Sequence, residues 1–219
     1  MALSTSRRTY ARGLATREEI LEGALPVFNQ HGDHTTLELL ARELELSKGR
    51  ITHHFPTKDL LLEGLLERYE QALNEAGRLP DGPWHLADVA ASFGRSLDVI
   101  VAYQYIAVAH STAITLGSRI HERVKESFAR RLQSMRPFAE YLVHLGLLKE
   151  EVLGQRHFDT WSTALVMCFV AWPIHHQNVA AHLARSLSRS IALRACMNTM
   201  APYLTAKGRL QYQEVFDAL

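Results

Sequence analysis

The sequence predicts an all-α protein with a small N-terminal helical unit and a larger helical body after it. Apolar residues recur three and four positions apart along almost the whole chain, which is the period of an amphipathic helix. Runs with the two-residue alternation of a strand are nearly absent. The breaker-rich segment LPDGP at residues 79–83 is the clearest boundary. We therefore assign residues 16–76 to the first unit and residues 84–219 to the second.

The composition is that of a folded chain and not of a disordered one or a polycation. Hydrophobic residues make up 47% of the 219 residues, charged residues 21%, and the formal net charge is +1. Any affinity for nucleic acid must therefore come from a local concentration of charge. Residues 1–15, in which Arg7, Arg8 and Arg12 precede the first acidic residue, Glu18, are expected to form a flexible basic arm.

Cysteine usage and hydropathy indicate the compartment. Cys168 and Cys196 lie in apolar surroundings without the spacing of metal ligands, as expected for reduced thiols in a core. The most apolar run, residues 165–172, is too short to span a bilayer, and no apolar signal segment follows the N-terminal arginines. We expect a soluble, cytoplasmic protein with no membrane partner.

The N-terminal unit is expected to hold four helices. Thr16 and Glu19 have the spacing of a capping box, so the first helix should begin at Thr16, bend at Pro26 and stop at Gly32. Three further helices should begin after hydroxyl caps at Thr36, Ser47 and Thr57. The turn between the second and third helices has room for only residues 44–46, which describes a helix-turn-helix unit.

The second unit reads as a series of longer helices. We expect them over residues 86–110, 112–117, 118–146, 157–177 and 179–204, with a bend at Pro173. The charged run 119–126 and the pair Arg130-Arg131 should form a solvated helix face or the surface beneath the first unit. No nucleophile elbow, phosphate-binding glycine loop or pair of carboxylates can be placed, so we predict no catalytic residue, metal site or cofactor.

Several linked motifs in the first third of the chain match a known family. They are FNQHG at residues 28–32, TTLELLA at 35–41, LSKG at 46–49 and HHFPTK at 53–58, followed by Leu61. In spacing and residue type across three consecutive helices, the chain resembles the TetR family of bacterial transcriptional regulators. The resemblance implies a DNA-binding domain in residues 16–76 and an effector-binding and dimerisation domain in residues 84–219.

The third helix has the features of a helix that reads the major groove. Ile51 and Phe55 lie one turn apart and should face inward, which turns the remaining side chains outward. Arg50 is the candidate for reading a guanine edge, a contact worth roughly 1–3 kcal/mol of discrimination. Thr36 and Lys58 lie at helix starts that favour phosphate. The candidate DNA-contacting residues are Thr36, Ser47, Lys48, Gly49, Arg50, Thr52, His53 and Lys58.

Two residues depart from the family pattern. Thr52 stands where the family usually has a tyrosine whose hydroxyl meets a phosphate, so that contact is either lost or moved to His53. Glu45 stands where the turn often has glycine, so it must accept a strained backbone or form a different turn.

The paired histidines and the arm each have two interpretations. Neighbours on a helix point about 100° apart, which disfavours a metal site at His53-His54; we expect His53 to face DNA and His54 to pack. His175-His176 is either structural or a ligand contact. The arginine arm is either solvated or reaches an adjacent groove of the DNA.

Aromatic and polar side chains of the second unit could line a cavity of the mostly apolar kind that small ligands prefer. Any single one of them, at helical spacing, is more often part of a core. Because the resemblance implies an effector site, we expect a pocket. Its candidate residues are Phe93, Tyr103, Tyr105, His110, Tyr141, Trp161, Met167, Trp172 and His175.

Together these features predict a ligand-responsive regulator, most simply a repressor released from its operator by a small-molecule effector. A homodimer should bind near-palindromic double-stranded DNA through the helix-turn-helix units. The helices at 157–177 and 179–204 should form a four-helix dimer interface through Leu165, Val166, Phe169, Val170, Leu187, Ile191 and Leu193. An activator, a metal-responsive sensor or an all-helical enzyme on the same fold are the alternatives. DNA association would place the protein on the bacterial nucleoid.

Overall fold

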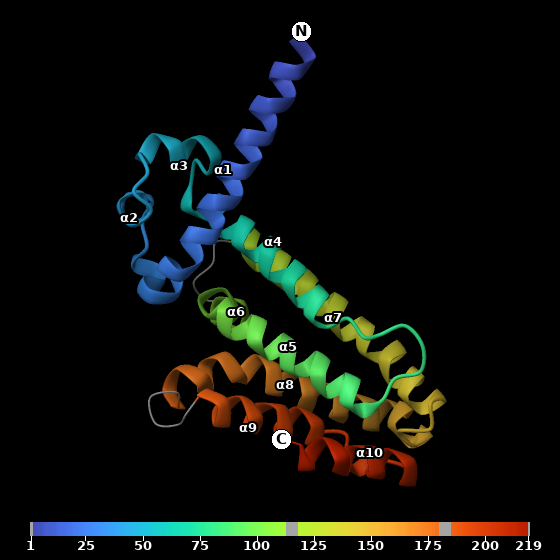
Figure 1. Cartoon of the computed structure of the whole chain (residues 1–219). Helices are drawn as coiled ribbons and strands as arrows, with labels where there is room; N and C mark the ends of the chain where they lie inside the picture. The colour runs from blue at the N-terminus through green and yellow to red at the C-terminus, as the bar shows by residue number, and fades with distance from the viewer. Residues whose placement is uncertain (1, 113–117, 180–184, 219) are drawn as a thin grey trace.

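The computed structural model describes the backbone of residues 2–112, 118–179 and 185–218 (Figure 1). Within these ranges it leaves out the side chains of residues 2–15, 109–112, 118–121, 124, 128, 173–179 and 185–188. The fold is all-α, as predicted. The helices are α1 (Ala2–His31), α2 (Leu37–Glu43), α3 (Lys48–His54), α4 (Lys58–Ala76), α5 (Leu86–Ala102), α6 (Gln104–Thr112), α7 (Ser118–His144), α8 (Gln155–Val179), α9 (Arg185–Asn198) and α10 (Ala206–Asp217).

The first four helices enclose a small core of their own. Phe28 of α1, Leu40 of α2, Ile51 of α3 and Leu65 of α4 are fully buried, and Phe55, which follows α3, is 2% exposed. In Figure 1, α2 and α3 lie to one side of α1, and α4 runs from them toward the larger body. The helix α4 thus joins the first unit to the body, and α1 also contacts α6 of the body.

The starts of α2, α3 and α4 are confirmed at the predicted hydroxyl caps. The side chains of Thr36, Ser47 and Thr57 accept hydrogen bonds from backbone N–H groups three residues later, at 3.1, 3.2 and 3.2 Å. Each bond satisfies a donor that the first helical turn leaves without a partner.

The start of α1 differs from the prediction. The helix begins at Ala2, so Thr16 lies inside it and does not act as a cap. A capping box starts a helix only where the preceding chain is not helical, and residues 2–15 are rich in alanine, leucine and arginine, which favour helices. Gly32, with a φ of +54°, ends the helix as predicted.

A break that the sequence analysis missed divides the predicted helix 86–110 into α5 and α6. The backbone leaves the helix at Tyr103, and the side chain of Asn29 satisfies the two groups that the break exposes. It donates to the Ala102 carbonyl at 2.8 Å and accepts from the Tyr105 N–H at 3.0 Å. The break is therefore fixed by a contact with α1.

The C-terminal part also differs from the prediction. The predicted helix 179–204 stops at Asn198, a short 3₁₀ turn (Ala201–Tyr203) follows, and α10 then begins after Thr205. The side-chain oxygen of Gln211 on α10 accepts a hydrogen bond from the backbone N–H of Leu86. This unpredicted helix therefore satisfies a backbone donor in the first turn of α5. α5 contacts α4, α6, α8, α9 and α10 and is the centre of the body (Figure 1). The predicted segment 112–117 falls outside the described residues except at Thr112.

No helix in the described part of the chain is long and apolar enough to cross a membrane.

Candidate DNA-binding face and effector cavity

The outward face of α3 has the orientation that its sequence predicts. Ile51 and Phe55 are buried, whereas Lys48, Gly49, Arg50 and His53 are exposed. A Cβ atom added at Gly49 would have no atom within 4 Å, so the backbone there is open to close approach by a partner. The helix thus presents cations and hydrogen-bonding groups around a residue without a side chain, a surface that suits a DNA groove.

Lys48 and Arg50, the two cationic side chains of this face, each form an ion pair with an acidic side chain. Lys48 pairs with Glu38 of α2, and the contact lowers the pKa of that carboxyl group. Nη2 of Arg50 lies 3.6 Å from the Glu19 carboxylate and donates to the Thr16 hydroxyl at 3.4 Å. The Lys48 and Arg50 side chains nevertheless remain 58% and 47% exposed, so both are accessible to acceptors on DNA.

Lys58 lies in the first turn of α4, beside the end of α1. Its ammonium donates to the backbone carbonyl of Asp33 at 2.7 Å and lies 5.6 Å from the ring centroid of Phe28. These contacts fix the cation near a helix start, where free N–H groups also favour an anion. Thr36, at the start of α2, is exposed.

The two departures from the family pattern have defined conformations. The Thr52 hydroxyl donates to the carbonyl groups of Lys48 and Gly49 at 3.1 and 3.3 Å. Because these bonds use the hydroxyl proton within the helix, Thr52 has no proton to donate to a phosphate, and exposed His53 is the polar side chain beside it. Glu45 has a φ of +52°, so the turn keeps the left-handed conformation with a non-glycine residue.

His53 and His54 differ in environment. His53 is exposed, whereas His54 is half-buried, and burial lowers the pKa of His54. Their rings meet edge to face with centroids 5.0 Å apart. Among the side chains that the structure describes, no three His, Cys, Asp or Glu residues gather as a metal site. The side chains of Arg7, Arg8 and Arg12 lie outside the described residues.

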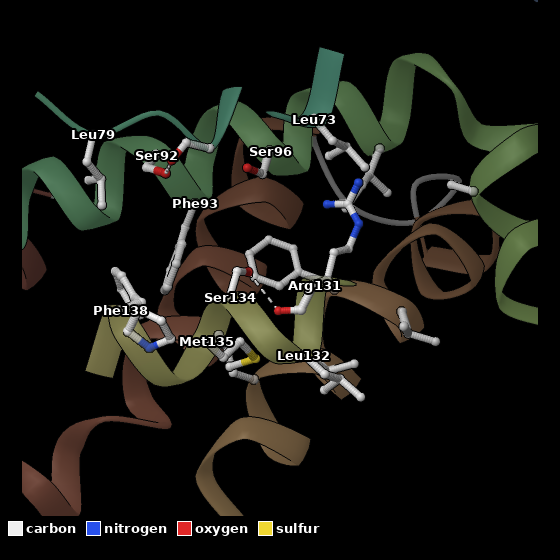
Figure 2. Close-up of a pocket in the computed structure, with 18 of the residues that line it drawn as sticks. Leu73, Leu79, Ser92, Phe93, Ser96, Arg131, Leu132, Ser134, Met135 and Phe138 are labelled. Carbon is white, nitrogen blue, oxygen red and sulfur yellow. Dashed lines mark hydrogen bonds between the residues drawn. The ribbon is translucent and has the colours of Figure 1, made fainter. Parts of the chain in front are cut away.

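The body contains a cavity of about 570 Å³ between α4, α5, α7 and α8 (Figure 2). This volume lies within the range of small-molecule sites, about 300–1,000 Å³. The walls are mostly apolar, with three serines and one arginine. They comprise Tyr69, Leu73, Gly77, Leu79, Trp84, Ser92, Phe93, Ser96, Ile100, Ala107, Arg131, Leu132, Ser134, Met135, Pro137, Phe138, Leu165, Val166, Phe169 and Val170.

Of the described side chains that we predicted to line a pocket, only Phe93 lines this cavity. Tyr105 stacks on Phe28 instead, with ring centroids 5.2 Å apart, and Tyr103 packs against Tyr69. Tyr141 does not line it either, and its hydroxyl donates to the Gly82 carbonyl at 3.0 Å. The buried Trp161 and Trp172 and the exposed Met167 also lie outside this lining. The side chains of His110 and His175 lie outside the described residues.

Among the cavity residues that the sequence analysis missed, the largest group on one helix lies on α7. Arg131, predicted on a charged surface, lines the cavity, whereas Arg130 turns toward Glu70 of α4 at 3.6 Å. Nearer the start of α7, Arg123 pairs with Glu67 of α4 at 3.1 Å. This part of the helix therefore lies against α4, beneath the DNA-binding unit. The apolar residues Met135 and Phe138, one turn apart on α7, were the sequence signal that this helix faces the interior of the body.

The α8 residues that we predicted for the dimer face line the cavity, whereas Ile191 of α9, from the same prediction, is exposed. Leu165, Val166, Phe169 and Val170 face the cavity, and Leu193 of α9 is buried. The exposed side chains lie on the opposite face of the helix, because successive residues of a helix point about 100° apart. They are Thr163, Ala164, Met167 and Ala171 on α8, and Ile191 and Ala195 on α9. The side chain of Leu187 lies outside the described residues.

Comparisons with known proteins agree with this architecture. The model of bacterial regulatory proteins of the tetR family matches residues 20–65, and a second TetR model, described as a bacterial transcriptional repressor, matches residues 68–212. No curated protein matches the chain.

Solved structures share the fold. A TetR-family regulator from Marinobacter aquaeolei VT8 is 20% identical with a TM-score of 0.80, covering 92% of this chain and 97% of its own. One from Streptomyces coelicolor is 18% identical with a TM-score of 0.60, covering 93% of this chain and 89% of its own. The family models together extend over both units, and the chain belongs to the TetR family of bacterial transcriptional regulators.

Proposed function

We propose that the protein is a homodimeric repressor that leaves its operator when a small molecule occupies the cavity. The observation that carries the DNA-binding part is the outward face of α3, where Lys48, Arg50 and His53 surround open Gly49. Two such faces about 34–36 Å apart would meet successive major grooves on a near-palindromic operator.

Dimerisation through α8 and α9 would use their exposed side chains. Met167 is 55% exposed and Ile191 is 45% exposed, and the small residues Ala164, Ala171 and Ala195 lie beside them. Small side chains let two helices approach closely, and exposed apolar ones supply area to bury. A four-helix contact formed by two copies of α8 and α9 follows from this arrangement.

The link between cavity and DNA would be α4. Tyr69 and Leu73 near its C-terminal end line the cavity, and Lys58 lies in its first turn. A ligand that fits the cavity better when α4 is displaced would favour the displaced state. It would thereby change the separation of the two α3 helices, and the shift is limited by the ligand's preference between the states.

The test is binding of the full chain to the DNA upstream of its own gene. Affinity should fall with salt at a log–log slope of about −0.9 per phosphate contact. Lys58→Ala should weaken binding to all sequences and make this slope shallower, while Arg50→Ala should relax the preference at one base position. Lys207→Ala, on α10 at the far end of the body, is the control and should change neither quantity.

Two results would contradict this proposal. One is a purified protein that binds no upstream fragment at low salt. The other is an Arg50→Ala variant with unchanged sequence preference, which would remove Arg50 from base reading. Transcription in vitro from the same fragment separates repression, in which added protein lowers the transcript, from activation.

A further inference from the structure

The cavity holds a fixed positive charge. Among its lining residues the charged one is Arg131, which lies on α7 and extends toward Leu73 of α4 and Ser96 of α5 (Figure 2). Burial lowers the pKa of this guanidinium, and neighbouring Tyr69 and Glu70 partly oppose that effect. An arginine in a protein nonetheless keeps its proton at neutral pH, so the cavity is cationic at this point.

The described part of the chain does not neutralise this charge. Glu70 is close enough to influence Arg131, but its Oε1 atom pairs with Nη2 of Arg130 at 3.6 Å. No described carboxylate lies within 4.0 Å of the Arg131 guanidinium, and the guanidinium donates no hydrogen bond to a described residue. A partly buried cation without a carboxylate in contact is unfavourable, and an anion that enters the cavity would relieve the cost.

The rest of the cavity defines the remainder of the ligand. Phe93, Phe138 and Leu79 lie at the end away from Arg131 (Figure 2). Ser92 already donates to the Gly77 carbonyl at 3.1 Å, and Ser134 donates to the Arg131 carbonyl at 2.8 Å. These two hydroxyl protons are therefore occupied within the protein.

Ser96 differs from the other two serines. Its hydroxyl is half-buried and makes no hydrogen bond to a described residue, and Arg131 extends toward it. Arg131 and Ser96 are therefore two neighbouring donors that the cavity offers to a ligand, on the side away from Phe93 and Phe138.

We propose that the cavity takes an organic acid. The apolar body of the ligand fills the end formed by Phe93 and Phe138, and its carboxylate accepts hydrogen bonds from Arg131 and Ser96. A charge-assisted contact of this kind is stronger than a neutral one, so it selects acids over the corresponding alcohols. The assignment deepens the proposed function, since it names the effector class of the same cavity.

Tryptophan fluorescence of the full-length protein gives a direct test, because Trp84 lines the cavity. The probes are two acids, decanoate and 4-phenylbutyrate, and their neutral counterparts, 1-decanol and 4-phenyl-1-butanol. Each acid should bind about tenfold more tightly than its alcohol, the factor expected for one hydrogen bond to a charged group. Arg131→Met should abolish that preference, so that acid and alcohol bind equally, while Arg131→Lys should retain part of it.

Two further variants on α7 serve as controls. Arg136→Met removes a surface arginine that pairs with Glu140 and lies outside the cavity, and it should preserve the preference for acids. Arg130→Met frees Glu70 to pair with Arg131 and should weaken acid binding toward that of the alcohols. Circular dichroism and operator affinity of each variant verify that the fold is intact.

The inference is overturned if acids and alcohols bind equally, if Arg131→Met keeps the preference, or if none of the four probes binds at millimolar concentration. Operator binding on the same preparations distinguishes this failure from that of the proposed function. Acid binding that depends on Arg131 but leaves the DNA complex intact would support the site and refute the effector role. Operator binding without any acid preference would do the reverse.

Discussion

Tyr105 of α6 donates its phenolic hydrogen to the carboxylate of Asp33 at 2.6 Å, and the backbone carbonyl of the same Asp33 accepts from Lys58 at 2.7 Å. Asp33, which follows α1, therefore contacts both the body and the start of α4. Asn29 adds two bonds to the break between α5 and α6. The DNA-binding unit is attached to the body at this polar junction as well as through α4.

Tyr105→Phe should weaken this junction. The variant loses a hydrogen bond to a charged group, so the free energy of unfolding should fall by about 1–2 kcal/mol in urea titrations. Tyr103→Phe is the matched control, because the Tyr103 hydroxyl makes no hydrogen bond to a described residue, and it should have little effect. Equal losses in the two variants would contradict a role for the Tyr105–Asp33 bond.

Stability should decrease in alkali because of buried tyrosines. Burial raises the pKa of Tyr69 to about 12, and burial with the bond to Asp33 raises that of Tyr105. Since the folded state keeps these protons while the unfolded state loses them near pH 10, the contribution is full below pH 10 and is lost as the pH rises toward 12. Between pH 9 and 11, the free energy of unfolding should fall less steeply with pH in Tyr69→Phe than in the unsubstituted protein. The ordinary tyrosine pKa, about 10, lies within this range.

The left-handed conformation of Glu45 should make this turn prefer glycine. Glu45→Gly should be more stable than Glu45→Ala by about 1 kcal/mol, because a Cβ atom is unfavourable at positive φ. At Glu22, exposed in the middle of α1, the order of the glycine and alanine variants should reverse. Thermal unfolding of the four variants would reveal whether the conformation or the residue type sets the order.

Gly49→Ala should separate folding from DNA binding. The added methyl group has open space and should raise stability by up to about 1 kcal/mol, because alanine favours the helix. On the proposed interface it would hold the backbone away from DNA and lower operator affinity. Gly208→Ala is the contrasting variant, since its Cβ would lie 2.1 Å from the Leu147 carbonyl oxygen, so it should destabilise the fold. Operator affinity unaffected by Gly49→Ala would argue against close approach there.

Cys168 should be the more reactive thiol. A hydrogen bond from Cys196 lowers the pKa of Cys168, and the same contact raises that of Cys196. Because the thiolate is the nucleophile, alkylation of Cys168 by iodoacetamide should have a pH midpoint below the ordinary value of about 8.5. Cys196→Ala should move the midpoint upward, and Cys168→Ser should remove the fast reaction.

Local signals were sufficient for the DNA-binding unit. The one-turn spacing of Ile51 and Phe55 determines which face of α3 points outward, and Ser47 determines where the helix begins. Both features depend on neighbours within a few residues, so the sequence alone could predict them.

Features that depend on distant contacts could not be predicted in this way. The break at Tyr103 requires Asn29, far away in the sequence, and the orientation of Arg131 depends on how α7 packs against α4. Helical periodicity indicates that Leu165 and Phe169 face inward, but it cannot tell a packed interior from a hollow one. For that reason a cavity wall was interpreted as a dimer interface.

The pairing of Lys48 with Glu38 and of Arg50 with Glu19 has a consequence for how the protein searches DNA. On the proposed interface, phosphate or base acceptors of DNA would displace these two carboxylates, so each contact with DNA would be an exchange of one acceptor for another. A random sequence that engages only one cation gains little from that exchange, and the complex should dissociate quickly. An operator that engages both displaces both carboxylates together, so the internal acidic residues shorten the time spent at wrong sites more than at the right one.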